Sequence, residues 1–432
     1  MAMVVKNNMS ALSTLNTLNK NTNALSKSLQ KVSSGMKINS AADDASGYAI
    51  SERMRVQIRS LDQANSNAQN GGSMMKVAEG AVSSTVEILK TLKEKAVNAA
   101  NDTNTDADRQ TIQKELDQSI DQINDNANVT FNGQYLVDGS KNSKTTVTCT
   151  AMTNQSLSTA TKSSTALTAL AARNGDSLNI RATDKVTVSW VKDGKTYSSS
   201  MEIKADTKLG DALKLCTDID VKTEANSFIA LDGSKNSVYT ASGESGVTIS
   251  AKGTGINGQI SGFTISITDN TGAVRKSANA ALDAFDETLR AQNESDDNSV
   301  NLQIGTKANQ TIKVGLTDMK AQALGLQGKD NSTLQVGNQE QANAAINVLD
   351  SAIQKALDQQ TTIGAVQSRL EYTQSNLTTA SENVTAAEST IRDADMAKEM
   401  TEYTKNNVLM QAAQSMLAQA NQSSSNVLSL LQ

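Results

Sequence analysis

The strongest constraint on this chain is a sevenfold repeat of apolar residues in two long segments. One series occupies every seventh position from Met54 to Ala96, and the other runs from Leu349 to Ile391, each spanning 42 residues without a polar exception. Such spacing keeps one stripe of a helix facing a partner only when helices supercoil. Each series corresponds to about 63 Å of helix. We therefore predict two rods, with a core formed by Met54, Leu61, Met75, Val82, Leu89, Leu349, Ile363, Leu370, Leu377, Val384 and Ile391.

The position of the rods in the sequence fixes how they can meet. Residues from about 97 to 345 lie between them, so the chain must reverse its direction between the two rods if they pair. We expect an antiparallel pair with both termini at one end. A shorter amphipathic helix, between Ile112 and Ala127, should cover the pair. It follows Thr105-Asp106-Ala107-Asp108, which is typical of a capping box.

The seam beside the apolar stripe of the second rod is polar. Its heptad positions are Gln360, Gln367, Gln374 and Ser381. Two interpretations are equally open, because amide and hydroxyl groups can form hydrogen bonds between the rods or face water.

Each terminus carries a further amphipathic pattern outside the rods. Apolar residues between Ala11 and Met36 are spaced alternately by four and three, and the pattern recurs from Leu409 to the end of the chain. We expect amphipathic helices here, whose apolar stripes pack against partners and are the candidate assembly contacts. The side chains concerned are Leu15, Leu18, Leu25, Leu29, Val32, Met36, Leu409, Met416, Leu417, Val427, Leu428, Leu430 and Leu431.

An energy comparison indicates that these ends need partners. Burying the seven apolar side chains of the first segment returns about 10–20 kcal/mol. Ordering its 26 residues costs about 26–50 kcal/mol before hydrogen bonds are counted. A lone molecule should therefore struggle to fold its ends, and neighbouring copies should complete their burial. The alternative is an ordinary helical hairpin within one chain.

The amino-acid composition narrows the functions open to the chain. It contains neither histidine nor proline among 432 residues. Without histidine there is no Ser-His-Asp triad, Cys-His site or histidine-containing zinc site, and without proline long helices can run unbroken. A net charge of −5 offers no basic surface for nucleic acid. Cys149 and Cys216 lack the clustered spacing of a metal site or disulfide framework. We expect no enzyme, cofactor or metal centre.

The sequence contains no recognisable export or membrane segment. Its start is polar by the seventh residue, which argues against a secretory signal. No run approaches the roughly 18 apolar residues of a membrane span. We expect a soluble chain that either stays inside the cell or leaves it without a cleaved signal peptide.

Residues 141–296 form an insert of different composition. The heptads vanish there, and alternation around Asp193-Gly194 predicts a β-hairpin with a type I′ turn. A second strand is expected over 263–267, and a helix over 281–289. These features predict a separate mixed α/β domain. After it, the pattern over 302–316 predicts a further hairpin close to the second rod.

Two short motifs are better explained by structure than by chemistry. The GxGxxG string at 253–258 is followed by a β-like run rather than the helix that a dinucleotide site requires. The acidic pairs Asp43-Asp44 and Asp296-Asp297 lack the spacing of a calcium loop. We interpret these acids as helix starts or solvated loops.

Several segments resemble the bacterial flagellins. Residues 32–50 look like the family signature L-S-S-G-x-R-I-N-S-A-x-D-D-A-A-G-x-A-I, and Phe131-Asn132-Gly133 with Leu136 resembles its F-N-G-x-x-L element. Residues 391–397, and 416–422 with 427–431, resemble its C-terminal motifs. The resemblance covers roughly residues 1–140 and 300–432.

The resemblance implies a mainly α fold. Its long antiparallel heptad-repeat coiled-coil core is formed by the N- and C-terminal regions, with a β-hairpin and an inserted mixed α/β outer domain. Three domains are implied: a terminal inner-tube coiled coil (1–44 with 392–432), a rod-like core (45–140 with 297–391) and a variable, solvent-facing insert (141–296).

The implied function is that of a structural, non-enzymatic subunit of the helical filament of a bacterial flagellum, serving motility. Its termini would fold on assembly with identical copies. The alternative is a hook-filament junction protein, which shares these termini. The resemblance further implies secretion through the type III export channel, an extracellular location, an export chaperone and a cap protein as partners, and no role for a membrane or nucleic acid.

An animal Toll-like receptor is a further partner implied by the resemblance, through innate immune recognition of the first rod. The family commonly carries arginine at the position of Thr91 and leucine at the position of Lys95, whereas Glu115 is retained. Loss of the arginine fork and gain of a charge predict weaker or altered receptor activation. The surface concerned comprises Lys90, Thr91, Glu94, Lys95 and Glu115.

Overall fold

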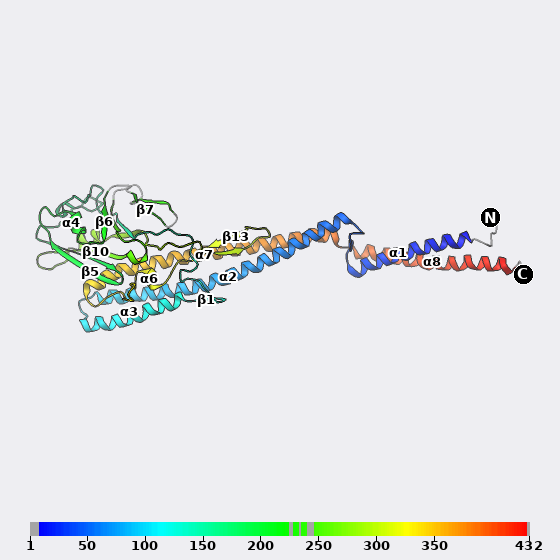
Figure 1. Cartoon of the computed structure of the whole chain (residues 1–432), viewed down its shortest axis with the longest axis horizontal. Coiled ribbons are helices and arrows are strands. Elements are labelled where there is room, and N and C mark those ends of the chain that lie inside the picture. Colours follow the sequence, from blue (N-terminus) through cyan, green and yellow to red (C-terminus); the bar gives the residue numbers. More distant parts are fainter. Residues whose placement is uncertain (1–7, 224–227, 233–234, 240–245, 430–432) are drawn as a thin grey trace. The chain divides into compact units, whose positions relative to one another are not determined.

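The computed structural model describes residues 8–223, 228–232, 235–239 and 246–429. Long helices occupy the two ends of the chain, and short antiparallel sheets occupy the middle (Figure 1). Two compact units are formed: Met1–Ala68, Gln303–Gln310 and Tyr372–Gln432 make one, and Gln69–Leu302 with Thr311–Glu371 make the other. Among the described residues, no helix is long and apolar enough to cross a membrane.

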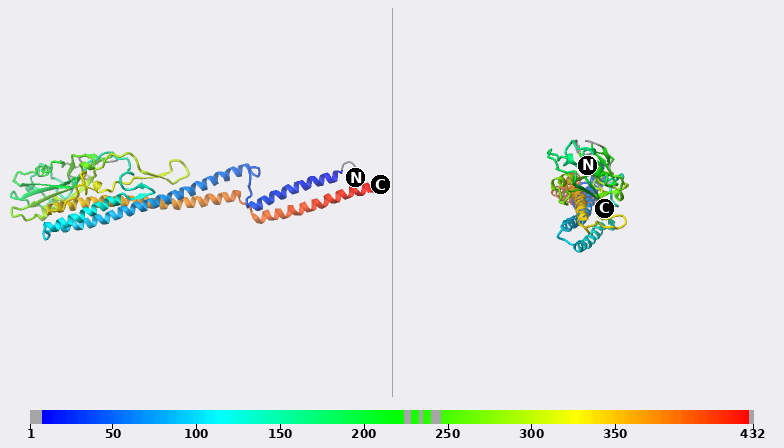
Figure 2. Two further views of the ribbon diagram at one scale, coloured as in Figure 1. Left: turned by 60° about the horizontal axis from the view of Figure 1, so that its bottom comes forward. Right: turned by 90° about the vertical axis from the view of Figure 1, so that its left-hand side faces the viewer.

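The first unit contains two antiparallel helices that pair along their length, α1 (Met9–Ser34) and α8 (Met396–Ser429), as Figure 1 and the left view of Figure 2 show. Asn8 caps the start of α1, where its Oδ1 accepts a hydrogen bond from the amide of Ala11 at 3.0 Å. Gly35 ends the helix with φ of 72°, a left-handed conformation that glycine adopts without steric cost.

Two longer helices, α2 (Ala45–Ala99) and α7 (Gln339–Arg392), contribute residues to both units. In the second unit, α3 (Asp106–Ala127) lies against α2, because Asn126 Nδ2 donates to Ser84 Oγ at 3.1 Å and Arg109 Nε donates to the Ala99 carbonyl at 2.9 Å. The predicted capping box at Thr105 and Asp108 is confirmed.

The insert is built around two antiparallel sheets that share one apolar core. The four-stranded sheet has the order β11 (Phe285–Leu289), β3 (Ala151–Asn154), β9 (Val247–Ala251), β6 (Ile219–Lys222). The three-stranded sheet has the order β10 (Ile260–Thr268), β4 (Lys185–Lys192), β5 (Lys195–Glu202). Phe263 is among the largest fully buried side chains of this core.

Smaller elements complete the second unit and the hairpins. The two-stranded sheets pair β1 (Thr130–Phe131) with β2 (Gln134–Tyr135), β7 (Phe228–Leu231) with β8 (Ser237–Tyr239), and β12 (Val300–Gln303) with β13 (Thr311–Val314). The short helices are α4 (Leu209–Leu213), α5 (Lys276–Leu282), α6 (Ala321–Leu324), η1 (Leu167–Ala169) and η2 (Ile256–Gly258).

Most local predictions for the middle of the chain are confirmed. Asp193 and Gly194 have φ values of 52° and 71°, as a type I′ turn requires, and they join β4 to β5. The strand expected over 263–267 lies within β10, and the hairpin expected over 302–316 is formed by β12 and β13. After the glycine-rich string comes β10, and a Cβ added to Gly253 would lie 2.7 Å from the Gly258 Cα. These glycines therefore allow close approach of two backbones.

The helix predicted over 281–289 was wrong in its second half. Helix α5 ends at Leu282, and β11 begins at Phe285 and pairs with β3. The ring of Phe285 lies edge-on to that of Phe263, with ring centroids 5.1 Å apart. Burial alternates along β11, so its side chains follow the period of a strand rather than that of a helix.

Candidate assembly surfaces

Polar side chains join α1 to α8 at several points along the pair. They join the side chain of Asn8 to the Ala420 carbonyl (3.1 Å), Asn21 to the Leu409 carbonyl (3.2 Å), Asn406 to Ser28 Oγ (3.0 Å) and Lys31 to Glu399 (3.4 Å). Within the described part of the two helices, only Ser28 and Ala413 are buried. The pair therefore lacks an enclosed apolar core.

The apolar side chains of the pair remain in contact with solvent. Nine large ones are between 41% and 68% exposed, namely Met9, Leu12, Leu15, Leu29, Met396, Met400, Val408, Leu409 and Met416. Soluble proteins rarely leave so many apolar groups together in contact with water unless a partner covers them. We define these nine side chains as the terminal apolar surface.

The residues expected to mediate polymerisation fall into three groups. Leu15, Leu29, Leu409 and Met416 belong to the terminal apolar surface, whereas Leu18, Leu25, Val32, Met36 and Leu417 are half-buried. The side chains of Val427 and Leu428, and the whole of Leu430 and Leu431, lie outside the described residues.

The rod-core residues lie mostly inside their units. Those that are buried are Leu61, Met75, Val82, Leu89, Leu349, Ile363, Leu370 and Leu377, and those that are half-buried are Met54, Val384 and Ile391. In the first unit, Leu61 and Ala64 of α2 pack against Leu377 of α7.

The polar seam forms hydrogen bonds between the rods at two of its four positions. Gln367 Nε2 donates to Glu79 Oε2 at 2.7 Å, and Ser381 Oγ donates to Asp62 Oδ1 at 3.0 Å. These bonds favour the first of the two interpretations left open by the sequence at Gln367 and Ser381.

The segment that carries the long signature, residues 32–50, forms a tight loop between α1 and α2. Asp43 Oδ2 accepts hydrogen bonds from the amides of Asn39 and Ser40, which hold the pKa of this carboxyl below its usual value despite some burial. Asp44 Oδ1 accepts from the amides of Ser46 and Gly47 at the start of α2. The interpretation of Asp43-Asp44 as acids at a helix start is confirmed.

Arg392, at the end of α7, is the residue that the sequence analysis missed. It is 6% exposed, and its Nη1 lies 2.7 Å from Glu52 Oε1 and 3.3 Å from Ser51 Oγ. Its guanidinium lies over the Tyr48 ring, 5.4 Å from the centroid. The Arg392 hydrogen bond is the main reason that the pKa of Glu52 is lowered. The sequence shows only that Arg392 directly follows Ile391, the last member of the apolar heptad series, and its burial is known from the structure.

The candidate receptor surface lies on α2 and α3 of the second unit. Lys90, Thr91, Glu94 and Glu115 are exposed, and Lys95 forms an ion pair with Glu115 at 2.8 Å. Lys90 pairs with Glu87 at 2.7 Å on the same helix. Lys95, which departs from the family pattern, is therefore ion-paired with Glu115, the family glutamate that is retained.

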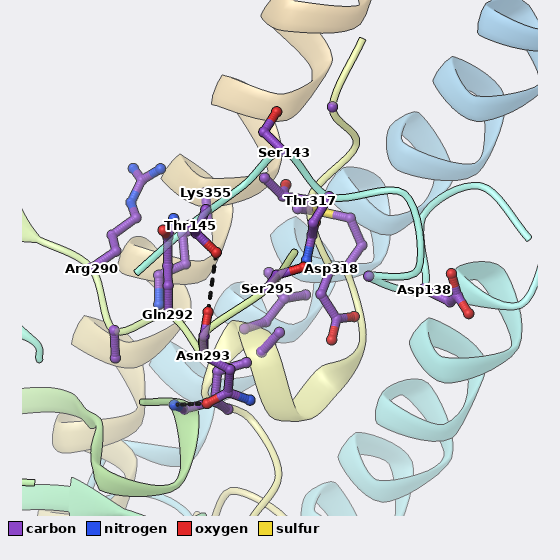
Figure 3. Close-up of a pocket in the computed structure, with 18 of the residues that line it drawn as sticks. Asp138, Ser143, Thr145, Arg290, Gln292, Asn293, Ser295, Thr317, Asp318 and Lys355 are labelled. Atoms are coloured by element: carbon purple, nitrogen blue, oxygen red, sulfur yellow. Dashed lines mark hydrogen bonds between the residues drawn. The ribbon is translucent and has the colours of Figure 1, made fainter. Parts of the chain in front are cut away.

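A cavity of about 310 Å³ lies where the chain enters and leaves the insert (Figure 3). Its cations are already paired: Arg290 contacts Glu287 and Asp358, and Lys355 contacts Glu287 at 3.5 Å. Burial raises the pKa of Asp318, which accepts a hydrogen bond from the Lys320 amide. In the described ranges there is no group of three metal-binding side chains. The cavity thus shows structural ion pairs rather than a nucleophile with its base.

Comparisons with known proteins match both ends of the chain. Residues 5–142 match the family profile described as the bacterial flagellin N-terminal helical region, and residues 346–431 match the bacterial flagellin C-terminal helical region. A flagellin of Clostridium tyrobutyricum is 37% identical, with 97% of this chain and 99% of that protein covered. A flagellin of Bacillus subtilis is 31% identical, with 99% and 100% covered.

Among solved structures, the flagellar hook-associated protein 3 of Legionella pneumophila is 15% identical, with a TM-score of 0.34 over 78% of this chain and 97% of that one. That likeness is too distant to support the junction-protein alternative. The family is shown by the relatives that match over nearly their full length and by the two family profiles that match the ends of the chain. The chain therefore belongs to the bacterial flagellin family, and it is a structural subunit of a flagellar filament.

Proposed function

We propose that this flagellin polymerises through α1 and α8, whose terminal apolar surface is covered by neighbouring copies as the filament grows. The single observation that carries the proposal is the exposure of nine large apolar side chains on a helix pair in which only two described residues, Ser28 and Ala413, are buried. A paired but uncovered surface of this kind is marginally stable in a lone molecule.

The free energy available from burying the terminal apolar surface is large enough to favour assembly. Complete burial of one such side chain contributes about 1.5–3 kcal/mol, and about half of each remains to be buried. Nine side chains then offer about 10 kcal/mol to assembly. Because these contacts join different patches of identical copies, they are heterologous and propagate into a helical polymer rather than a closed ring.

In this proposal the chain has three domains. Residues 1–44 with 392–432 form a coiled coil of the inner tube, residues 45–140 with 297–391 form the rod-like core, and residues 141–296 form the variable, solvent-facing insert. The sevenfold series along α2 and α7 and the burial of most of its members support a heptad-repeat core. We assign no enzymatic activity to the insert, because flagellins are structural proteins and its ion pairs offer no catalytic pair.

Export and recognition complete the proposal. The subunit would leave the cell through the type III channel without a cleaved signal peptide, accompanied by an export chaperone and placed by a cap protein. Recognition by a Toll-like receptor would be weak, since the Lys95–Glu115 ion pair at 2.8 Å engages the retained glutamate. Thr91 also lacks the planar donors of an arginine.

Deletion of residues 1–30 or 400–432 tests the proposal. Electron microscopy of seeded preparations should show no filaments of either truncated chain, while circular dichroism should show that the helices of the second unit still fold. Filaments of normal length grown from a truncated chain would contradict it. Abundance separates the alternatives, because a filament subunit should dominate protein sheared from the cell surface, whereas a junction protein should be scarce there.

A further inference from the structure

The junction between the terminal helices and the rod helices is organised around one side chain, that of Arg392. Its partners come from two other segments of the chain: Met36 lies in the loop after α1, and Tyr48 and Glu52 lie in the first turns of α2. The sequence separations from Arg392 to Met36 and Glu52 are 356 and 340 residues. No other described side chain of the first unit is both charged and buried.

Backbone hydrogen bonds also join the segments around Arg392. The amide of Lys37 donates to the Arg392 carbonyl at 2.7 Å, and the amide of Ala394 donates to the Gly35 carbonyl at 2.9 Å. Met36 and Asp393 form an isolated antiparallel bridge between these bonds. The segment that follows α1 and the segment that precedes α8 are therefore hydrogen-bonded to each other beside the Arg392 guanidinium.

This arrangement uses the properties of arginine specifically. Two nitrogens of its planar fork are used: Nη1 donates to both Ser51 Oγ and Glu52 Oε1, and Nε lies 3.2 Å from Met36 Sδ. The flat face of the guanidinium lies over the Tyr48 ring. A lysine would supply the charge but neither the fork nor the flat face. A buried cation that lost these partners would be costly, so its presence specifies one geometry.

We propose that Arg392 is a positioning residue for assembly. It holds the C-terminal end of α1 and the N-terminal end of α8 against α2 and α7, so that an incoming subunit presents both helix ends in a defined position. The inference rests on the proposed function. Without the Arg392 contacts, these two helix ends would become ordered only when the subunit joins the filament. A binding element that must be ordered on binding associates less favourably than a preorganised one.

Seeded growth of filament fragments with purified subunits tests the inference. We expect Arg392→Gln to slow growth at least about tenfold and Arg392→Lys to recover only part of the rate. Arg53→Gln is the matched control, because Arg53 lies on the same stretch of α2, is exposed, and donates within its own helix to the Ala49 carbonyl. This control should grow at the wild-type rate.

A charge exchange separates positioning from simple loss of folding. Arg392→Glu should abolish growth, and adding Glu52→Arg should restore part of it by re-forming the ion pair with the charges exchanged. Recovery should be incomplete because Arg55, which lies 3.4 Å from Glu52, would repel the new arginine. Growth of Arg392→Gln within twofold of wild type, or a double variant no faster than Arg392→Glu alone, would overturn the inference. Failure of wild-type subunits to extend the seeds would instead contradict the proposed function.

Discussion

Replacing Leu12, Leu15 and Leu29 by alanine should weaken polymerisation without unfolding the rods. These side chains are 51%, 41% and 52% exposed on α1, so about half of each is left for a neighbouring copy to bury. At about 1.5–3 kcal/mol for a whole leucine, the three together withhold about 3 kcal/mol from assembly. That difference corresponds to a critical concentration raised about 100-fold. Alanine is the better helix former, so the intrinsic helicity of α1 is not reduced.

The assay is sedimentation of filaments grown from seeds over a range of subunit concentrations, with the unsedimented protein taken as the critical concentration. The matched control replaces Val147 and Val274 by alanine, because they are similarly exposed, at 48% and 56%, but belong to the insert. The control should polymerise like the wild type. A critical concentration of the leucine variant within threefold of the wild type would refute the reasoning, as would an equal shift in the control.

Three further predictions concern other parts of the chain. Burial raises the pKa of Asp283 to about 6, so the folded state binds the proton more tightly and this group lowers stability as pH rises from about 4 to 6. Asp283→Asn should therefore raise the unfolding free energy by about 3 kcal/mol at pH 7.5 and have little effect on it at pH 4. Urea titrations that gave the same gain in unfolding free energy at both pH values would show that the ionisation of Asp283 is not its cause. Lys95→Leu should strengthen Toll-like receptor signalling in reporter cells, and an unchanged titration would count against the ion-pair explanation. Gly47→Ala should cost about 1–3 kcal/mol of stability in thermal unfolding, because its Cβ would lie 2.5 Å from Asp44 Oδ2 and 2.7 Å from Ile38 Cδ1; an unchanged melting temperature would show that the loop gives way.

The sequence predicted the elements whose signals are local or periodic. The sevenfold series anticipated the long helices α2 and α7, and the terminal patterns anticipated α1 and α8. The capping box at Thr105 and the turn at Asp193-Gly194 were each visible within a few residues, because caps and type I′ turns depend on adjacent backbone groups.

What the sequence did not reveal depends on contacts between distant segments. A short apolar run such as 281–289 fits a helix or a strand, and β11 forms because β3, more than 130 residues earlier, offers it a ladder. The role of Arg392 likewise requires Met36 and Glu52, which no spacing rule connects to it. The exposure of the terminal apolar surface also had to be measured, since an amphipathic pattern is the same whether one partner helix covers it or several do.

Amide hydrogen exchange of the dilute monomer and of the assembled filament tests the central claim most directly. The account predicts fast exchange throughout α1 and α8 in the monomer and strong protection of the same amides in the filament. Residues 75–95 of α2 and 345–365 of α7 should be protected in both states. Slow exchange along α1 and α8 in the isolated monomer, equal to that of the rod helices, would contradict the claim that these ends are completed by other copies.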